Sequence, residues 1–558
     1  MLTGKPPPMT RLRHLLASLL PAAAAAAALA QQQTPPLPPT ADPVQLQRQR
    51  EELERQRQQR KPEATAPKLS APAPGEPGAG AAGPSFVLKR VDFDPSHLIS
   101  REQLDAVVAP QLGKPTTFAD VRALAQRINA LYYAAGHITA RAFVPSQKIV
   151  DGVLKVRLVE GRLARIELPA QTRLAPDFIV GLIDTPEGAL LDVPRIGRRL
   201  ERLHRGTDTR IGLGFVAAET KEPGLSVAQV QVEEPPSWTL RASLSNEGAE
   251  SVGREQLSVT GTWNNLLGRT DKLSLLLIGS KGSASANAQY SLPLPGPFLA
   301  WGTRLGAGLS HGLTRAVSPG FETVRLDGKS DGANLSLTQP LWISGAWALD
   351  GGATLSHTRS ATDIADERFS DVRTDSLALS LTLSRQGESS NWLASLVATP
   401  ASTRAEGVES RSTAHYQLLA SGQQLIDENW SVQGRAGLQY SGDVSLPSTL
   451  QFQIGGSSSV RGYRSPTASG DKGETLSLEV HRRFMERYDG FAFVDHGATR
   501  TEGGATTRLL SAGFGLSWTH PVWSVSATLA APQRRIEGQD KKPELLVRLS
   551  ADLDKLWR

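Results

Sequence analysis

The sequence predicts a transmembrane antiparallel β-barrel that is preceded by two small α+β domains and a polar N-terminal helix. Short segments with strict alternation of apolar and small or polar residues fill residues 236–558. Two successive units between residues 86 and 235 each follow the order strand, helix, helix, strand, strand. A polar stretch near the N-terminus carries helix start and stop signals. Together these patterns predict an exported protein with several domains.

The first segment, residues 1–30, has the features of a secretory signal peptide. Arg11 and Arg13 precede an apolar run that ends in small residues. The run is short and interrupted by Pro21, which argues against a spanning helix. Met1 and Met9 are both candidate start residues. We expect the mature chain to leave the cytoplasm.

Bulk composition excludes one class of partner. The 558 residues carry a formal net charge of +6 and no cysteine. The charge is modest and lies in no long basic run, so a nucleic-acid partner is not expected. A chain without cysteine avoids mispaired thiols during export.

Residues 42–61 predict a helix that is polar on every side. Asp42 suits the N-cap, Pro43 the first helical position, and Pro62 ends the helix. About twenty residues at 1.5 Å each reach roughly 30 Å, the thickness of a bilayer core. Two interpretations stay open, a solvated helical linker and a rod that fits a water-filled pore. Residues 62–85, rich in Pro, Ala and Gly, predict a flexible and partly extended tether.

The two α+β units cover residues 86–161 and 162–235. In the first unit, capping-box patterns begin both helices: Ser100 with Gln103, and Thr117 with Asp120. The second unit repeats the order of elements with different residues. Generic α+β domains, which would have no special function, are an alternative interpretation of these units. Their position before the barrel is therefore more informative than their order of elements.

The barrel is predicted from alternation with period two. Leu377, Leu379, Leu381 and Leu383 share one face of a segment whose other face is Ser, Ala and Thr. Ten-residue segments of this kind are typical of a membrane barrel with a wet interior. A soluble sandwich would also alternate, but its core would need more bulky aliphatic residues. The segment 448–455 reads as a barrel strand, and 543–558 as the closing strand that carries Trp557.

Residues 455–473 predict a long loop on the outer side of this barrel, with a cation, Arg461, inside it. Asp495 lies in a later strand and should face the lumen, because a carboxylate that faces lipid is costly. If the loop folds inward, Arg461 and Asp495 form an ion pair, for which the planar guanidinium is well suited.

The neighbours of this pair fit an inward loop. Gly462 allows a turn or a close approach of the backbone, and Gly497 removes a side chain where the loop tip would rest. Tyr463 could pack on the wall with its hydroxyl hydrogen-bonded.

With these motifs the chain resembles the TpsB transporters of two-partner secretion, of the FhaC and ShlB type, in the superfamily that includes BamA. The loop motif is Val460, Arg461, Gly462 and Tyr463, and the wall motif is Phe493, Asp495 and Gly497. The resemblance covers the whole mature chain and implies a barrel of sixteen strands after two POTRA domains, 86–161 and 162–235. It also implies that the loop folds into the barrel and that helix 42–61 plugs the resting pore.

The resemblance further implies a location and partners. The barrel, residues 236–558, would lie in the bacterial outer membrane and the POTRA domains in the periplasm. Partners would be a secreted TpsA-type exoprotein, outer-membrane lipid and, during biogenesis, the barrel assembly machinery. An extended client could pair with an open POTRA sheet edge, for which residues 210–218 are a candidate, with an ordinary internal strand as the alternative.

Other classes of function find less support. Residues 308–312 fit the G-x-S-x-G pattern of hydrolases but precede no helix, and the histidines show no metal-binding spacing. We expect no catalysis, no cofactor and no metal. The rivals are a BamA-like assembly or insertion factor, which would share the inward loop, and an outer-membrane enzyme or porin, which needs no POTRA domain.

Overall fold

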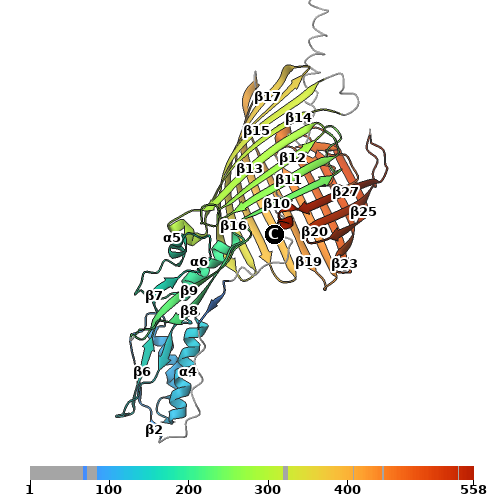
Figure 1. The fold of residues 1–558 in the computed structure, drawn as a ribbon. Helices are drawn as coiled ribbons and strands as arrows, with labels where there is room; N and C mark the ends of the chain where they lie inside the picture. Colours follow the sequence, from blue (N-terminus) through green and yellow to red (C-terminus); the bar gives the residue numbers. More distant parts are fainter. Residues whose placement is uncertain are drawn as a thin grey trace, which may run out of the picture.

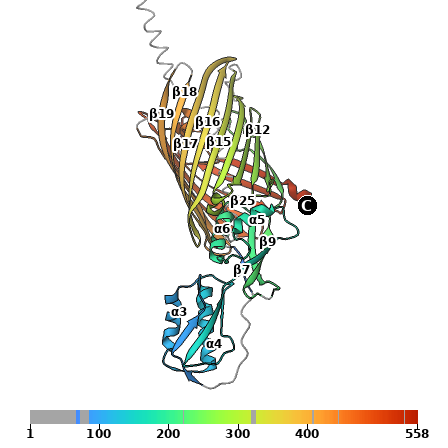
Figure 2. The same ribbon diagram turned by 90° about the vertical axis from the view of Figure 1, so that its left-hand side faces the viewer.

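The computed structural model describes residues 67–71, 85–220, 222–317, 325–405, 408–442, 445–537 and 539–557. The predicted signal peptide and the predicted helix 42–61 lie outside the described residues, as does most of the predicted tether. Figures 1 and 2 show a tilted barrel with the two α+β domains arranged one after the other beyond one of its ends.

The first domain packs two helices on a small sheet of order β3-β6-β5, in which β3 and β6 are parallel. Both predicted capping boxes are present, at Ser100 and at Thr117. Residues 86–93 form two short strands separated by two residues. The elements are β2 (Phe86–Val87), β3 (Arg90–Phe93), α3 (Arg101–Val108), η2 (Ala109–Gln111), β4 (Pro115–Thr116), α4 (Phe118–Ala134), β5 (Arg141–Phe143) and β6 (Val153–Val159).

The second domain has the same order of elements, as its sequence predicts. It consists of β7 (Arg162–Glu167), α5 (Pro176–Ile183), α6 (Val193–Arg205), β8 (Arg210–Ala217) and β9 (Leu225–Glu233). Its sheet, however, has a fourth strand, β1 (Leu69–Ser70), from the predicted tether, and the order is β1-β8-β9-β7. The tether is therefore ordered where it meets this domain, and β8 is not the open edge that residues 210–218 suggested.

The second domain is fixed to the barrel by a short helix, α7 (Pro297–Trp301), between two barrel strands. Leu299 of α7 is only 5% exposed and packs into the domain's hydrophobic core. The Arg202 guanidinium donates a hydrogen bond to the Ala300 carbonyl at 3.0 Å, and that of Arg205 to Ser384 Oγ at 2.6 Å. Apolar burial and these hydrogen bonds hold the domain against the barrel end.

The barrel is closed and antiparallel, and β27 pairs with β10. Its sixteen strands confirm the predicted fold class and strand number. They are β10 (Trp238–Ser245), β11 (Gln256–Asn264), β12 (Lys272–Ser280), β13 (Ser283–Pro293), β14 (Arg304–Arg315), β15 (Leu326–Ser344), β16 (Trp347–Ile364), β17 (Glu367–Gln386), β18 (Ser390–Ala405), β19 (Val408–Leu425), β20 (Trp430–Tyr440), β23 (Lys472–Phe484), β24 (Tyr488–Arg500), β25 (Thr506–Thr519), β26 (Trp523–Pro532) and β27 (Glu544–Asp552).

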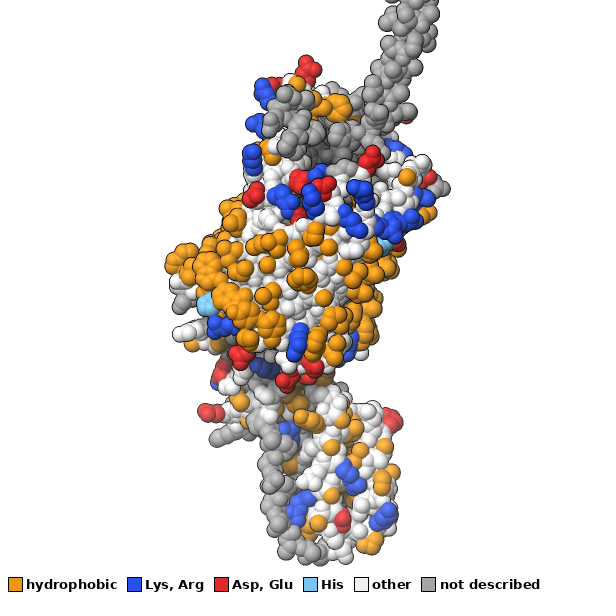
Figure 3. Space-filling view, turned by 90° about the vertical axis from the view of Figure 1, so that its right-hand side faces the viewer, with side chains coloured by type: hydrophobic (Ala, Val, Ile, Leu, Met, Phe, Trp, Pro, Cys, Tyr) orange, Lys and Arg blue, Asp and Glu red, His pale blue; other side chains and the backbone are white. Residues whose placement is uncertain are grey.

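Alternation along the strands produces an apolar belt on the outside of the barrel. Leu379, Leu381 and Leu383 are 48%, 49% and 40% exposed, as expected for side chains that face lipid. Figure 3 shows hydrophobic side chains covering the middle of the barrel wall, with charged side chains gathered above and below them. No helix in the described part of the chain has the length and apolarity needed to cross a bilayer.

The C-terminal strand is shorter than predicted. It ends at Asp552 and is followed by the 3-10 turn η4 (Leu553–Leu556), so the prediction that Trp557 lies on the strand is wrong. Asp554 in this turn accepts a hydrogen bond from the Leu240 N–H at 3.0 Å, which turns the chain back across β10. The Trp557 ring then lies 6.2 Å from that of Trp238.

One carboxylate, Glu160, ties the first domain together. It accepts hydrogen bonds from the Ser96 hydroxyl at 2.6 Å and the Tyr132 hydroxyl at 3.0 Å. It also accepts hydrogen bonds from the backbone N–H groups of His97 and Leu98, at 2.9 and 3.2 Å. Burial alone would raise the pKa of Glu160, but these hydrogen bonds outweigh burial and hold the pKa below its usual value.

Glu160→Gln should destabilise the first domain by about 1–3 kcal/mol, because the amide cannot accept all of these donors. Hydrogen exchange of residues 86–161 in the full chain measures the change. The folded pKa of Glu160 lies below its unfolded value, so its stabilisation is complete above the unfolded pKa and is lost as the pH falls through the folded one. The difference in stability of the first domain between wild type and variant should therefore be large at pH 7 and small at acid pH. A difference that does not change with pH, or an equal loss in Asp151→Asn at an exposed turn, would contradict this role.

Candidate functional site in the barrel lumen

The long loop between β20 and β23 folds into the barrel. It contains the turn η3 (Ser448–Leu450) and a two-stranded sheet of β21 (Phe452–Ile454) and β22 (Ala468–Gly470). The prediction that segment 448–455 is a barrel strand is wrong, because β21 pairs only with β22. Phe452, Gln453 and Ile454 are 4%, 7% and 0% exposed, so both faces of β21 are covered and neither faces lipid.

Asp495 faces the lumen and meets Arg461 from this loop. Val494, its neighbour in β24, is 52% exposed on the lipid side, whereas Asp495 is 0% exposed. The Arg461 guanidinium grips the carboxylate through two hydrogen bonds of 2.7 Å, from Nε to Oδ2 and from Nη2 to Oδ1. The backbone N–H of Arg461 also donates to Oδ2 at 3.1 Å. Such a bidentate, charge-assisted contact is strong and directional.

A second carboxylate, Glu479 of β23, completes the site. Its Oε1 lies 2.9 Å from Arg461 Nη2, and the side chains of the two residues are 12% and 9% exposed. Nη2 also donates to Ser477 Oγ at 3.1 Å. The Phe493 ring lies under the guanidinium, with Arg461 Cζ 3.6 Å from the ring centroid, a cation–π contact. We call Arg461, Asp495 and Glu479 the lumenal clamp.

Sequence analysis missed Glu479 and Ser477, although the signal was present. Leu476, Leu478 and Val480 face lipid, so the residues between them must face the lumen. The pairing of β23 with β24 places Ser477 opposite Asp495 and Glu479 opposite Phe493. Pairing the two segments in the hairpin register would have found both residues.

Charged groups continue from the clamp toward the turn between β23 and β24. Glu479 also accepts from Arg435 at 3.1 Å and lies 3.0 Å from His481 Nε2. His481 Nδ1 is 2.7 Å from Asp489 Oδ2. The clamp is therefore part of a larger lumenal network that also contains Arg435, His481 and Asp489.

Two glycines allow the loop tip to rest on the wall. Gly462 has a φ of +83°, and a Cβ there would lie 3.0 Å from the Ala530 carbonyl oxygen. A Cβ at Gly497 would lie 2.7 Å from Val460 Cγ2, a distance that real contacts essentially never show. Both positions require the absence of a side chain, for the reasons that the sequence suggested.

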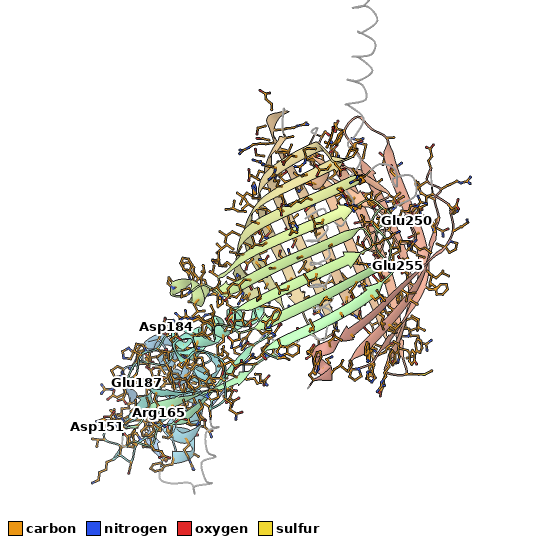
Figure 4. The ribbon with its side chains drawn as sticks, turned by 45° about the horizontal axis from the view of Figure 1, so that its top comes forward. Asp151, Arg165, Asp184, Glu187, Glu250 and Glu255 are labelled. Atoms are coloured by element: carbon orange, nitrogen blue, oxygen red, sulfur yellow. The ribbon has the colours of Figure 1, made fainter. Side chains whose placement is uncertain are left out.

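The tip is also attached on either side of the clamp. Tyr463 is 2% exposed, and its hydroxyl donates to the Leu510 carbonyl at 2.9 Å. Arg464 forms an ion pair of 2.9 Å with Glu250, which Figure 4 labels in the loop between β10 and β11. Gln539 donates to the Gly462 carbonyl at 3.3 Å. The seven residues of the two motifs thus meet in one place: Val460, Arg461, Gly462, Tyr463, Phe493, Asp495 and Gly497.

Two patterns weighed in the sequence find no catalytic geometry in the described residues. The G-x-S-x-G stretch lies within strand β14, without the strand-to-helix turn that the nucleophile needs. The described residues contain no group of three His, Cys, Asp or Glu side chains placed to hold a metal ion.

A closed barrel with an apolar belt, an arginine-clamped loop in its lumen and two α+β domains at one end defines a membrane protein of the POTRA-barrel class. The chain belongs to the haemolysin secretion/activation family ShlB/FhaC/HecB, whose model matches residues 224–518. The ShlB-type POTRA domain matches residues 86–161. The protein is thus a TpsB transporter of the outer membrane, with its POTRA domains in the periplasm, and its family is one of transporters rather than enzymes.

Named relatives are outer-membrane transporters, and a solved structure shares the fold. The outer membrane transporter CdiB of Dickeya dadantii (strain 3937) is 24% identical over 492 residues, covering 81% of this chain and 86% of the relative. The heme/hemopexin transporter protein HuxB of Haemophilus influenzae (strain 86-028NP) is 23% identical, covering 68% of each chain. The structure of CdiB from Escherichia coli, 21% identical, has the same fold, with a TM-score of 0.71 over 93% of this chain and 99% of that chain.

Gly497→Val should detach the loop tip, because the added side chain occupies the position of Val460. Trypsin digestion of the protein in detergent, read by mass spectrometry, should then show cleavage after Arg461, which is buried in the wild type. Ala492→Val places the same valine side chain on the lipid-facing side of the same strand and should leave Arg461 protected. Equal protection of Arg461 in both variants would contradict the packing of the tip on Gly497.

Proposed function

We propose that this protein is an outer-membrane translocator that receives an unfolded exoprotein through its POTRA domains and secretes it through the barrel lumen without ATP. The observation that carries the proposal is the lumenal clamp, which holds a long loop inside a membrane barrel. A passive porin needs neither this clamp nor the periplasmic domains. The client would be a TpsA-type exoprotein, in keeping with the role of the family in secretion.

The clamp suits a transport path because it holds the loop at one side of the lumen. Its partners and the other anchors named above come from β23 to β26 and from adjacent loops. Desolvating a buried charge network costs free energy, so the network contributes little to net stability. Its main effect is to hold the loop in one position. Shifting the loop would require the whole set of contacts to change together, which favours two discrete positions.

The remaining parts of the proposal concern energy and partners. The periplasm holds no ATP, so we infer that folding of the client at the cell surface prevents each exported segment from sliding back. Helix 42–61 would plug the resting pore. Lipid surrounds the apolar belt, and the barrel assembly machinery would insert the barrel. The alternative, a BamA-like insertion factor, shares the inward loop, but the family match favours the transporter.

Arg461→Ala and Asp495→Ala should each leave a barrel that inserts in the outer membrane but secretes poorly. Removing Arg461 leaves two buried carboxylates without their shared cation, and removing Asp495 leaves the guanidinium with Glu479 alone. Breaking a buried ion pair costs about 3–5 kcal/mol, enough to displace the loop. The measurement is the amount of co-expressed client in the medium per amount of barrel in the membrane. Arg315→Ala breaks an exposed ion pair with Asp327 in the same barrel and is the matched control. Normal secretion by both clamp variants would refute the proposal.

A further inference from the structure

The sheet edge of the second POTRA domain carries a strand of this chain's own N-terminal segment. β1 runs parallel to β8, with Leu69 opposite Leu213 and Ser70 opposite Gly214. The Leu213 N–H donates to the Lys68 carbonyl at 2.9 Å. In Figure 1 this strand is the short blue arrow beside β8. Main-chain pairing of this kind fits many sequences, so any selectivity must come from side chains.

The side chain of Leu69 enters a slot above helix α6. Leu69 packs against the hydrophobic core of the domain, and Ala71 packs there as well. A Cβ at Gly197, in the middle of α6, would lie 3.1 Å from Leu69 Cδ1. Glycine is unfavourable inside a helix, and here its missing side chain leaves the room that Leu69 fills. The slot therefore fits an aliphatic side chain.

Two further glycines bring the paired strand close to β8. A Cβ at Gly212 would lie 3.1 Å from the Lys68 carbonyl oxygen. A Cβ at Gly214 would lie 3.7 Å from Ser70 Oγ, so a small residue is suited to that position. The strand β8 thus carries glycines on the face along which the segment runs.

One charge marks the start of the segment. Lys68 Nζ lies 2.9 Å from Glu233 Oε1, and the two side chains are 79% and 69% exposed. The hydrogen bond from Lys68 lowers the pKa of Glu233. An ion pair so exposed contributes little affinity, so it helps to fix register and direction while Leu69 provides most of the binding.

We propose that the β8 edge is a binding site for an extended peptide with a basic, an aliphatic and a small residue in succession, and that residues 68–71 occupy it as a built-in competitor. The partner is an unfolded segment that runs parallel to β8 and places its aliphatic side chain over Gly197. This inference rests on the proposed function in that the client would supply such a segment. Because the competitor belongs to the same chain, its effective concentration is high, and a client must displace it.

The test uses the full-length protein in detergent and the labelled peptide Ala-Pro-Lys-Leu-Ser-Ala-Pro, the sequence of residues 66–72. Leu69→Asp should vacate the edge, because the slot is apolar. Fluorescence polarisation should then show peptide binding at least about tenfold tighter than in the wild type, where the edge is occupied. A peptide with Asp in place of Leu should not bind. Equal binding to wild type and variant, or binding to neither, would overturn the proposal.

A second variant locates the site. Adding Gly197→Leu to Leu69→Asp fills the slot with a good helix former, so α6 should remain folded while peptide binding is lost. Undiminished binding would show that the peptide lies elsewhere and would overturn the assignment. The assay needs no client and no secretion. Peptide binding could follow the expected pattern while secretion of the client does not depend on the clamp. In that case the proposed function is wrong, but the peptide-binding site at β8 is supported.

Discussion

The structure depends on one buried guanidinium that lies between two carboxylates inside the barrel. Arg461 is 7% exposed and Asp495 is 0% exposed, so each of these buried charges requires a partner of opposite sign. Carboxylates that face lipid would be costly, so their partner has to come from the lumen side. A loop on the outer side of the barrel can bring the cation only by folding inward. Inward folding of the loop, the positive φ of Gly462 and the missing side chain at Gly497 all follow from this requirement.

Strands β23 and β24 of the barrel wall thereby have two roles, one on each face. On its outer face β23 and β24 present Leu476, Leu478 and Val494 to lipid, and on its inner face they hold the clamp. Strict alternation along a strand allows both, because successive side chains point to opposite faces. At the periplasmic end, α7 anchors the second POTRA domain, so the edge that carries β1 keeps a defined place beneath the barrel. The sheet edge that carries β1 and the barrel lumen are therefore parts of one connected structure.

Sequence patterns predicted those features that depend on a single periodic rule. The leucines of 377–383 identify a strand with one lipid face, and capping residues such as Thr117 identify helix starts. The patterns failed where a segment is covered on both faces or held by distant partners. Phe452 and Ile454 belong to a loop hairpin, and Leu69 pairs with a strand that lies far along the chain. Trp557 leaves the last strand because Asp554 caps the Leu240 N–H, a contact that alternation cannot reveal. Glu479 was missed because its role appears only when two hairpin strands are placed in register.

The most direct test of the inward loop is a disulfide between the loop tip and the wall in cells. The chain has no cysteine, so Val460→Cys with Gly497→Cys creates a single possible pair, and a Cβ at Gly497 would lie close to Val460. The account predicts that this pair oxidises in the outer membrane and changes the electrophoretic mobility of the unheated protein. The control pair, Val460→Cys with the lipid-facing Ala492→Cys, should not oxidise. Free thiols that react with an impermeant maleimide from outside the cell would contradict it.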